Sequence, residues 1–390
     1  MTEKNVPKLR FSGFTKVWES TRIGEIAEVV GGGTPKTEVE EYWNGEIKWF
    51  TPSEIGKTKY IFDSERHISD NGLKNSSAKL LPKYTILLSS RATVGEISIA
   101  LTECSTNQGF QSLITKNNVD NEFIYYLIST IKNEFLRRSS GSTFLEISKN
   151  EIKRIPINIP ELSEQNKISN LFSAIDNKIE MLEKKCQYYQ DFKKYLMQRI
   201  FSSQDDKLRF ADNENWKTVK LGDVCKITMG QSPSSENYSE NNFHTVLIQG
   251  NADIINGKVV PRVYTSEITK ISKPGDIIMT VRAPVGDLAI NEFESCIGRG
   301  VCSIEGNKFI YYLLQSLKDN HVWERLSQGS TFESINSNDI KNLKVKMPSE
   351  ETQNTISLFL TEIDSKIELY EIQFLTFQKL KKGLLQQMFV

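Results

Sequence analysis

The second half of this chain repeats the first, and this repeat limits the possible folds more than any other feature. Four short segments recur in the same order: Lys8–Phe11 as Lys207–Phe210, Arg91–Glu96 as Arg282–Asp287, Phe123–Leu127 as Phe309–Leu313, and Gly141–Phe144 as Gly329–Phe332. The repeating unit is about half of the 390 residues, far longer than the roughly 20–50 residues of a solenoid repeat. Each half is therefore long enough to have its own core, and two similar halves can form a pseudo-two-fold axis within one chain.

Charge and hydrophobicity are those of an ordinary globular protein. The sequence has 49 basic and 49 acidic residues, so its net charge is zero. This balance argues against a polycationic protein that binds nucleic acid by itself, but it leaves room for DNA binding through local patches or together with a partner. No run of about 18 apolar residues is present, and the polar segment Met1–Arg10 lacks the apolar core of a signal peptide. We therefore expect a cytoplasmic protein with no membrane partner.

The residues that usually carry chemistry do not form a recognisable site. The five cysteines are scattered and form no CxxC pair, which favours reduced thiols and no metal site. The glycine-rich stretch 31–35 lacks the Lys-Ser/Thr that follows the glycines of a phosphate-binding loop. It is either a loop that brings the backbone close to another segment or a tight turn. We expect no catalytic residue and no cofactor bound by this chain.

Each half combines short strands with helices. Residues 85–89, 96–100 and 276–281 are short apolar or alternating runs, which predict strands. Residues 122–136 and 308–326 have helical spacing. The tyrosine pairs Tyr125/Tyr126 and Tyr311/Tyr312 lie within these helices, where they could stack on bases or pack in the core. Their position in an apolar helical pattern favours the core.

Two long amphipathic helices are the clearest structural prediction. Apolar residues at alternating spacings of three and four follow Pro160 and again Pro348, and no Gly or Pro interrupts either series before Gly383. This is the seam of a coiled coil. The seam residues are Ile168, Phe172, Ile175, Ile179 and Leu182 in the first helix, and Ile356, Leu360, Ile363, Ile367 and Phe374 in the second. Because each seam needs a partner, we predict an antiparallel pair, about 50 Å long at 1.5 Å per residue.

One position in each seam is a lysine, Lys193 in the first helix and Lys381 in the second. A lysine can extend its ammonium group out of the interface into solvent. Alternatively, a polar residue in a seam can set the register or dock a partner.

These patterns together predict an α+β protein with internal pseudo-two-fold symmetry. Two similar β-rich domains, residues 1–160 and 207–348, are separated by two long helices that form an antiparallel coiled coil. We place the first helix and its linker at 161–206 and the second helix at 349–390.

The order of these elements resembles the specificity subunit of type I DNA restriction–modification enzymes. The resemblance covers essentially the whole chain. The motifs that carry it are the Trp18 and Trp216 segments, Gly32-x-Thr34-Pro35 and Gly230-x-Ser232-Pro233, the two Gly-Ser-Thr-Phe blocks, Pro160–Gln165 and Pro348–Gln353, and Ile175–Ile179 and Ile363–Ile367.

The resemblance implies a DNA sequence-specificity subunit without catalytic activity of its own. Each β-rich part would be a target-recognition domain for one half of a bipartite double-stranded DNA site, with the helices as the spacer. The expected partners are two methyltransferase subunits and two restriction/translocase subunits. S-adenosylmethionine, ATP and Mg would be bound in those partners and not in this chain. The target sequence, the gap length and the presence of a nuclease subunit stay open.

Comparing the two halves suggests which residues contact DNA. Residues shared by both halves cannot distinguish two different half-sites, so they are scaffold, phosphate or docking residues. Arg91, Arg282, Ser142 and Ser330 are shared candidates, although ion pairs with Glu96 and Asp287 are the favoured interpretation of the two arginines. The diverging loops hold the base-reading candidates Lys36, Tyr42, Trp43, Trp49, Thr51, Ser53, Lys57, Lys59, Asn107, Gln108, Arg137 and Arg138 in the first half, and Ser235, Tyr238, Gln249, Asn251, Arg262, Arg299 and Gln328 in the second.

Two other classes of function stay open at this point. The chain could be an adaptor that dimerises through its two helices and binds protein or glycan with its β-rich parts. It could also be an enzyme with an unrecognised site. Methylation of a specific DNA sequence together with a methyltransferase would exclude the first alternative, and turnover by the chain alone would favour the second.

Overall fold

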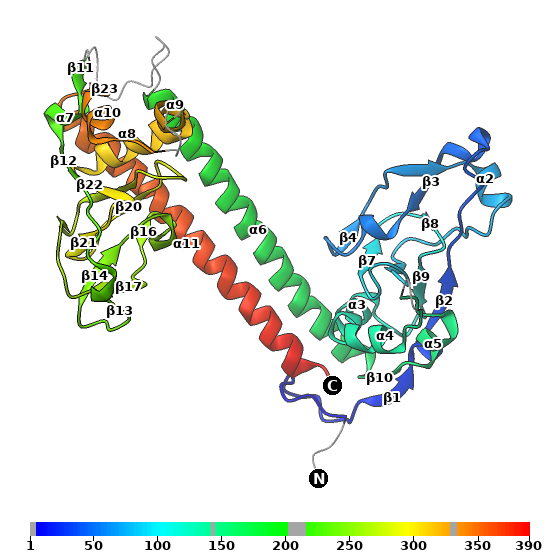
Figure 1. Ribbon diagram of the computed structural model, residues 1–390. Helices are drawn as coiled ribbons and strands as arrows, with labels where there is room; N and C mark the ends of the chain where they lie inside the picture. The colour runs from blue at the N-terminus through cyan, green and yellow to red at the C-terminus, as the bar shows by residue number, and fades with distance from the viewer. Residues whose placement is uncertain (1–4, 142–144, 202–215, 328–333) are drawn as a thin grey trace. The chain divides into compact units, whose positions relative to one another are not determined.

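The computed structural model describes residues 5–141, 145–201, 216–327 and 334–390, drawn in colour in Figure 1. The chain forms two compact units. Unit 1 is residues 1–183 with 372–390, and unit 2 is residues 184–371. Each unit therefore contains a β-rich part and one end of each long helix. The domain boundaries expected from the sequence stay a prediction.

The β-rich part of unit 1 is built around two sheets. The five-stranded sheet has the order β2 (Ala27–Gly31), β9 (Gln111–Thr115), β6 (Ile86–Leu88), β7 (Ile97–Ala100) and β4 (Tyr60–Ile61), and the three-stranded sheet has the order β5 (Arg66–Ile68), β3 (Trp43–Phe50) and β8 (Ser105–Thr106). A separate antiparallel pair joins β1 (Glu19–Arg22) to β10 (Pro156–Ile159). The helical elements are α1 (Ile23–Ile26), η1 (Glu40–Tyr42), η2 (Pro52–Glu54), α2 (Asp70–Lys74), α3 (Asn121–Thr130), α4 (Lys132–Arg138) and α5 (Lys149–Arg154).

Unit 2 repeats this plan with small differences. Its six-stranded sheet has the order β12 (Lys226–Met229), β22 (Val301–Glu305), β19 (Ile277–Thr280), β20 (Leu288–Ile290), β16 (Lys258–Val259) and β15 (Ile254–Ile255). Its five-stranded sheet has the order β13 (Tyr238–Ser239), β17 (Val263–Thr265), β14 (Thr245–Ile248), β21 (Ser295–Ile297) and β18 (Ile271–Ser272). The remaining elements are β11 (Lys217–Lys220) paired with β23 (Lys344–Met347), and α7 (Leu221–Val224), η3 (Ser235–Asn237), η4 (Asn251–Asp253), α8 (Lys308–Asp319), α9 (Val322–Ser327) and α10 (Ser337–Asn342).

The long helices are α6 (Leu162–Phe201) and α11 (Glu350–Met388). In unit 1 the N-terminal part of α6 packs with the C-terminal part of α11, and Asp176 lies 2.6 Å from Lys381. In unit 2 the opposite ends meet, and the Tyr189 and Tyr370 rings stack 5.6 Å apart. Figure 1 shows α11 (orange to red) beside α6 (green) in unit 2. The predicted antiparallel coiled coil is therefore confirmed within each unit.

The seam residues are the apolar face that joins the helix pair to each core. Seven of them are buried: Ile168, Phe172, Ile175, Leu182, Ile356, Leu360 and Ile363. Ile179 and Ile367 are partly buried against the cores, and Phe374 is half-buried. The Phe172 ring contacts Tyr126 of α3 at 5.0 Å. Each helix end thus shares one core with its β-rich part, which stabilises both because apolar area leaves water.

The predictions of the short elements were correct for the three strands and wrong for the lengths of two helices. The strands at 85–89, 96–100 and 276–281 are confirmed as β6, β7 and β19. Tyr126 and Tyr312 are buried, so core packing is confirmed for these two rings. Residues 122–136 form two helices instead of one, because Ile131 leaves helical geometry. Residues 308–326 also divide, because His321 adopts a left-handed backbone with φ of 56° that a continuing helix excludes.

The lysines of the two seams do not extend into bulk solvent. Lys193 is 15% exposed and pairs with Asp364, and Lys381 is 28% exposed and pairs with Asp176. All five cysteines are free thiols. Among the helices of the described residues, none combines the length and the apolar character that crossing a bilayer requires.

Candidate nucleic-acid interface

The glycine loops of both units are held close to a second loop. A Cβ atom on Gly32 would lie 2.0 Å from the Asn107 carbonyl oxygen, and one on Gly230 would lie 2.1 Å from the Gly298 carbonyl oxygen. Both positions therefore require glycine. Of the two interpretations of this stretch, a close approach of two backbones is the correct one. It fixes each glycine loop against the loop that carries Asn107-Gln108 or Gly298-Arg299.

In unit 2 these loops surround a pocket of about 340 Å³, which we call the Arg299 pocket. It is lined by Ser232, Tyr238, Gln249, Gly250, Asn251, Arg282, Ala283, Arg299 and Gly300. Five of these are DNA-binding candidates from the sequence: Tyr238, Gln249, Asn251, Arg282 and Arg299. The fold therefore brings together residues that are up to 61 positions apart, from 238 to 299.

Backbone hydrogen bonds hold the rim of the Arg299 pocket in place. The Asp253 carboxylate accepts hydrogen bonds from the backbone N–H groups of Gln249 at 2.8 Å and Gly250 at 3.3 Å. The backbone N–H of Arg299 donates to the Ser232 hydroxyl at 3.2 Å. These contacts use backbone groups and leave the side chains of Arg299 and Asn251 exposed. The rim is fixed while its reading side chains stay accessible.

The chemistry of the Arg299 pocket suits nucleic acid. Arg282 and Arg299 are exposed, and neither has an ion-pair partner within the residues that the structure describes. Among the described residues, no carboxylate lines the pocket. Arginine recognises guanine edges, and asparagine and glutamine recognise adenine edges, by paired hydrogen bonds. A second arginine nearby can neutralise a phosphate.

The corresponding loops of unit 1 present different side chains. Glu54 takes the place of Asp253, and its carboxylate accepts hydrogen bonds from the Thr51 backbone at 2.6 Å and the Thr51 hydroxyl at 2.7 Å. The Thr34 hydroxyl donates to the Gln108 side-chain carbonyl, and the Asn107 side-chain carbonyl (Oδ1) accepts from the Gly109 N–H at 2.8 Å. Lys36, Ser53, Lys57 and Gln108 are exposed and Tyr42 is half-buried. Unit 1 therefore offers a different set of hydrogen-bonding groups on a similar frame.

Three candidates of the first half are structural instead. Trp43 and Trp49 are buried, and their rings contact each other at 5.1 Å. Their indole N–H groups donate to the backbone carbonyls of Lys36 and Gly33. The Lys59 ammonium donates to Glu122, Tyr126 and Ser173 and is 9% exposed. Because these polar groups are already satisfied in the interior, we remove the three residues from the DNA-binding set.

Several other candidates form ion pairs or local contacts on the surface. Arg137 and Arg138 pair with Glu134 at 2.7 and 2.6 Å. Arg262 donates to the Ala252 carbonyl at 3.2 Å, close to the loop of Asn251. Ser235 is exposed in η3. Ser142, Gln328 and Ser330 lie outside the described residues.

The expected ion pairs of the two shared arginines are wrong. Glu96 pairs with Lys132, and Asp287 pairs with Lys318 at 2.5 Å. Arg91 instead pairs with Glu146 at 2.8 Å, a residue that faces it across an isolated β-bridge. In unit 2 the same bridge joins Arg282 to Ser334, which carries no charge. Among the described residues, the two shared arginines are therefore not equivalent, because the bridge partner of Arg91 carries a negative charge and that of Arg282 does not.

Sequence reasoning missed four residues of the Arg299 pocket. Ser232, Gly250, Ala283 and Gly300 line it without having been candidates. A Cβ on Gly300 would lie 2.1 Å from the Gln249 carbonyl oxygen, so this glycine allows the two loops to approach. The signal that could have indicated Ser232 was the recurring Gly-x-Thr/Ser-Pro motif.

Comparison with known proteins identifies the family. Residues 15–187 and 213–375 both match the type I restriction modification DNA specificity domain. This chain belongs to that family. The MjaIX type I restriction enzyme specificity subunit of Methanocaldococcus jannaschii is 30% identical to this chain, over 96% of this chain and 93% of the relative. The MjaX subunit of the same organism is described as putative and is 27% identical, over 98% and 95%.

Solved structures show the same fold. The crystal structure of a type I restriction–modification S subunit from M. genitalium matches 99% of both chains with a TM-score of 0.65 and 18% identity. A chain from a study of complex assembly and conformational transition of the type I system matches 95% of this chain and 97% of its own length, with a TM-score of 0.58 and 22% identity. The predicted fold class and the resemblance to a type I specificity subunit are confirmed.

Proposed function

We propose that this type I specificity subunit reads a bipartite double-stranded DNA site, one half with each unit, and that it catalyses no reaction itself. The observation that carries the proposal is the Arg299 pocket, where two exposed arginines meet an asparagine and a glutamine on a fixed rim. The matching loops of unit 1 bear threonine, serine and glutamine instead. Two different sets of reading side chains fit two different half-sites.

In this proposal, residues at different positions have different roles in DNA binding. Arg299, Gln249 and Asn251 read base edges, because their side chains can form paired hydrogen bonds with purines. Arg282 contacts a phosphate, whereas Arg91 is held back from this role by its ion pair with Glu146. The helix pair is the spacer that sets the gap between the half-sites, since two readers on one frame address half-sites at a fixed separation.

The partners supply the chemistry. We propose that this chain docks two methyltransferase subunits, which bind S-adenosylmethionine, and two restriction/translocase subunits, which use ATP and Mg. Type I complex assembly is the subject of the study that contains one of the matching chains. The neutral net charge supports a role for partner subunits, because a partner that also binds DNA adds to the phosphate contacts.

Methylation mapping tests the proposed function. The chain is expressed with its methyltransferase subunit in a host without other adenine methylation, and the genome is sequenced for modified bases. We expect methylation at one two-part sequence with a constant gap. Methylation without a common sequence, or none, would contradict the proposal and favour an adaptor. Turnover of a substrate by the purified chain alone would favour an enzyme.

Exchanging the bridge partners of the two shared arginines should change how binding depends on salt. In Glu146→Ser, Arg91 loses its partner and becomes free to neutralise a phosphate, so affinity rises by about 0.2–1 kcal/mol, the value of an exposed ion pair. Ser334→Glu should lower affinity by a similar amount. The slope of log K against log salt should steepen by about one in the first variant and flatten by about one in the second.

Fluorescence anisotropy with a duplex that carries the mapped site, at several salt concentrations, measures both quantities for the complex with its methyltransferase. The double variant is the control, since its two effects should cancel. Identical slopes for all four proteins would show that neither arginine contacts a phosphate.

A further inference from the structure

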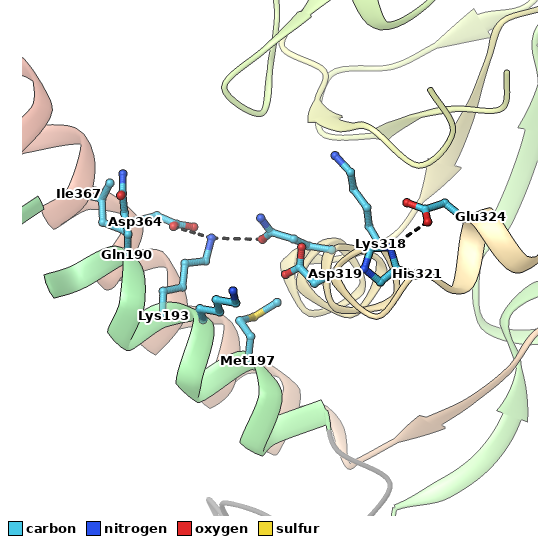
Figure 2. Close-up of a pocket in the computed structure, with 11 residues that line it drawn as sticks. Gln190, Lys193, Met197, Lys318, Asp319, His321, Glu324, Asp364 and Ile367 are labelled. Carbon is cyan, nitrogen blue, oxygen red and sulfur yellow. Dashed lines mark hydrogen bonds and ion pairs between the residues drawn. The ribbon is translucent and has the colours of Figure 1, made fainter. Parts of the chain in front are cut away.

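The two seam lysines are part of clusters with matching composition. In unit 2, Lys193 of α6 lies 2.7 Å from the Asp364 carboxylate of α11, and the Tyr312 hydroxyl of α8 donates to the same carboxylate at 2.7 Å. We call these three residues the Lys193 cluster. Figure 2 shows Lys193 reaching from α6 to Asp364. In unit 1, Lys381 of α11 lies 2.6 Å from Asp176 of α6, and the Tyr126 hydroxyl of α3 donates to Asp176 at 2.6 Å. These three are the Lys381 cluster.

Each cluster joins three elements at one carboxylate. The aspartate comes from one long helix, the lysine from the other, and the tyrosine from the β-rich part of the same unit. The lysine ammonium also lies over the tyrosine ring, at 5.2 Å in unit 2 and 5.6 Å in unit 1. Burial raises the pKa of Tyr126 and of Tyr312, so both phenols keep the proton that they donate.

The spacing of the charges selects one arrangement of the helices. On α6 the aspartate is at 176 and the lysine at 193, and on α11 they are at 364 and 381, so the separation is 17 residues on both. An antiparallel pair in this register therefore matches an aspartate with a lysine at both ends. In a parallel pair with equivalent positions aligned, Asp176 would face Asp364 and Lys193 would face Lys381. Because like charges repel each other across an interface, these positions disfavour the parallel arrangement.

A shift of register is excluded by the same residues. The rest of both seams is apolar, and apolar seams repeat every seven residues, so a slip of one heptad preserves most of the packing. That slip moves each lysine by about 10.5 Å along the axis and separates both pairs together. A partly buried lysine and aspartate would then lose their partners, which is costly.

We propose that the Lys193 and Lys381 clusters set the antiparallel register of α6 and α11 and orient the β-rich part of each unit on this pair, and that these residues thereby fix the gap between the half-sites. They are positioning residues, since they act through the helices and not on DNA. The statement on the gap rests on the proposed function, whereas the statement on register does not.

The test replaces the charges of both clusters by apolar side chains of similar size: Lys193→Met with Asp364→Leu, and Lys381→Met with Asp176→Leu. The replacements have space in unit 2, because the Lys193 cluster borders a cavity of about 610 Å³. Tyr312 keeps Thr361 as a hydrogen-bond partner at 3.2 Å, and Tyr126 keeps Lys59 at 2.9 Å. Apolar replacement of a buried ion pair often preserves or raises stability. If the clusters only stabilise the fold, the apolar variant should keep the native register. If the clusters set the register, the variant should stay folded but lose that register.

Register is measured by a thiol cross-link within unit 2. Cys186 of α6 is the one half-exposed cysteine of the described residues, and its Sγ lies 3.8 Å from Glu371 of α11. In a Glu371→Cys background a short reagent with two thiol-alkylating groups should join positions 186 and 371 through thioether bonds in the native register. We expect the four-residue apolar variant to keep or raise its Tm and to lose the cross-link several-fold. Exchanging the charges instead (Lys193→Asp with Asp364→Lys, and the same at 381 and 176) should restore it.

The gap is measured by methylation mapping of the same variants. We expect the apolar variant to methylate sites with more than one gap length and the charge exchange to return to a single gap. A folded apolar variant with an unchanged cross-link yield and one gap overturns the proposal. If the unmodified chain directs no sequence-specific methylation, the proposed function fails, and the cross-link still decides the statement on register.

Discussion

A chain with seven extra residues in α6 alone should lose sequence-specific methylation. The insertion, a second copy of residues 180–186 after Cys186, lengthens the interval from Asp176 to Lys193 from 17 to 24 residues while the interval on α11 stays at 17. Only one of the two ion pairs at 2.6 and 2.7 Å can then form. The other end of the seam is displaced by about 10.5 Å, and the unit there no longer meets its half-site.

The matched control lengthens both helices. A second copy of residues 368–374 after Phe374, added to the first insertion, makes both intervals 24 residues and allows both ion pairs again. Methylation should then return, at a reduced level, at sites whose gap is about three base pairs longer, since 10.5 Å corresponds to about three steps of 3.4 Å. Methylated-site sequencing measures both results. An unchanged gap in the doubly lengthened chain would disprove the role of the helix pair as the spacer.

Replacing Arg299 by alanine should relax specificity in one half-site and leave the other unchanged. The Arg299 side chain is exposed at the rim of the pocket, and its backbone is held by Ser232 and not by its own guanidinium. The variant should therefore fold normally. Loss of one paired contact with a base costs about 1–3 kcal/mol of discrimination, which methylation mapping detects as a degenerate base at one position.

Two variants make the interpretation specific. Arg299→Lys keeps the charge but not the planar fork of donors, so it should preserve most of the affinity and lose the discrimination. Gln108→Ala, at the equivalent loop of unit 1, should affect the other half-site. Equal loss at both half-sites in Arg299→Ala would indicate a general effect on folding or on phosphate binding and would contradict a base-reading role.

The spacing of the apolar residues and the internal repeat correctly predicted the antiparallel helices and the two similar β-rich parts. The seams gave the antiparallel helices because alternating spacings of three and four place apolar residues on one face. Comparing the halves indicated the loops of the Arg299 pocket, because residues that differ between two readers are the ones that can distinguish sites. Both predictions were possible from a single sequence, because one uses the local spacing of residues and the other compares the two halves of the same chain.

The errors have a common physical cause. Trp49 and Lys59 lie where the two halves diverge, yet Trp49 is buried in strand β3 and Lys59 is bonded to Glu122. Which side chains of a diverging segment face inward depends on tertiary packing, and divergence alone does not report it. Arg91 likewise finds Glu146, 55 positions away and not the nearby Glu96. Sequence distance is a poor guide to ion pairs, because side chains pair with whatever the fold brings near.

The way the rim of the Arg299 pocket is held has a consequence for how new specificities arise. Asp253 and Ser232 hold the loops through backbone N–H groups, so the loop conformation does not depend on which side chain stands at 249, 251 or 299. A substitution at an exposed position such as Asn251 or Arg299 should change the free energy of unfolding by less than about 0.5 kcal/mol. Selection can therefore exchange the bases that are read one position at a time, without a compensating mutation elsewhere in the chain.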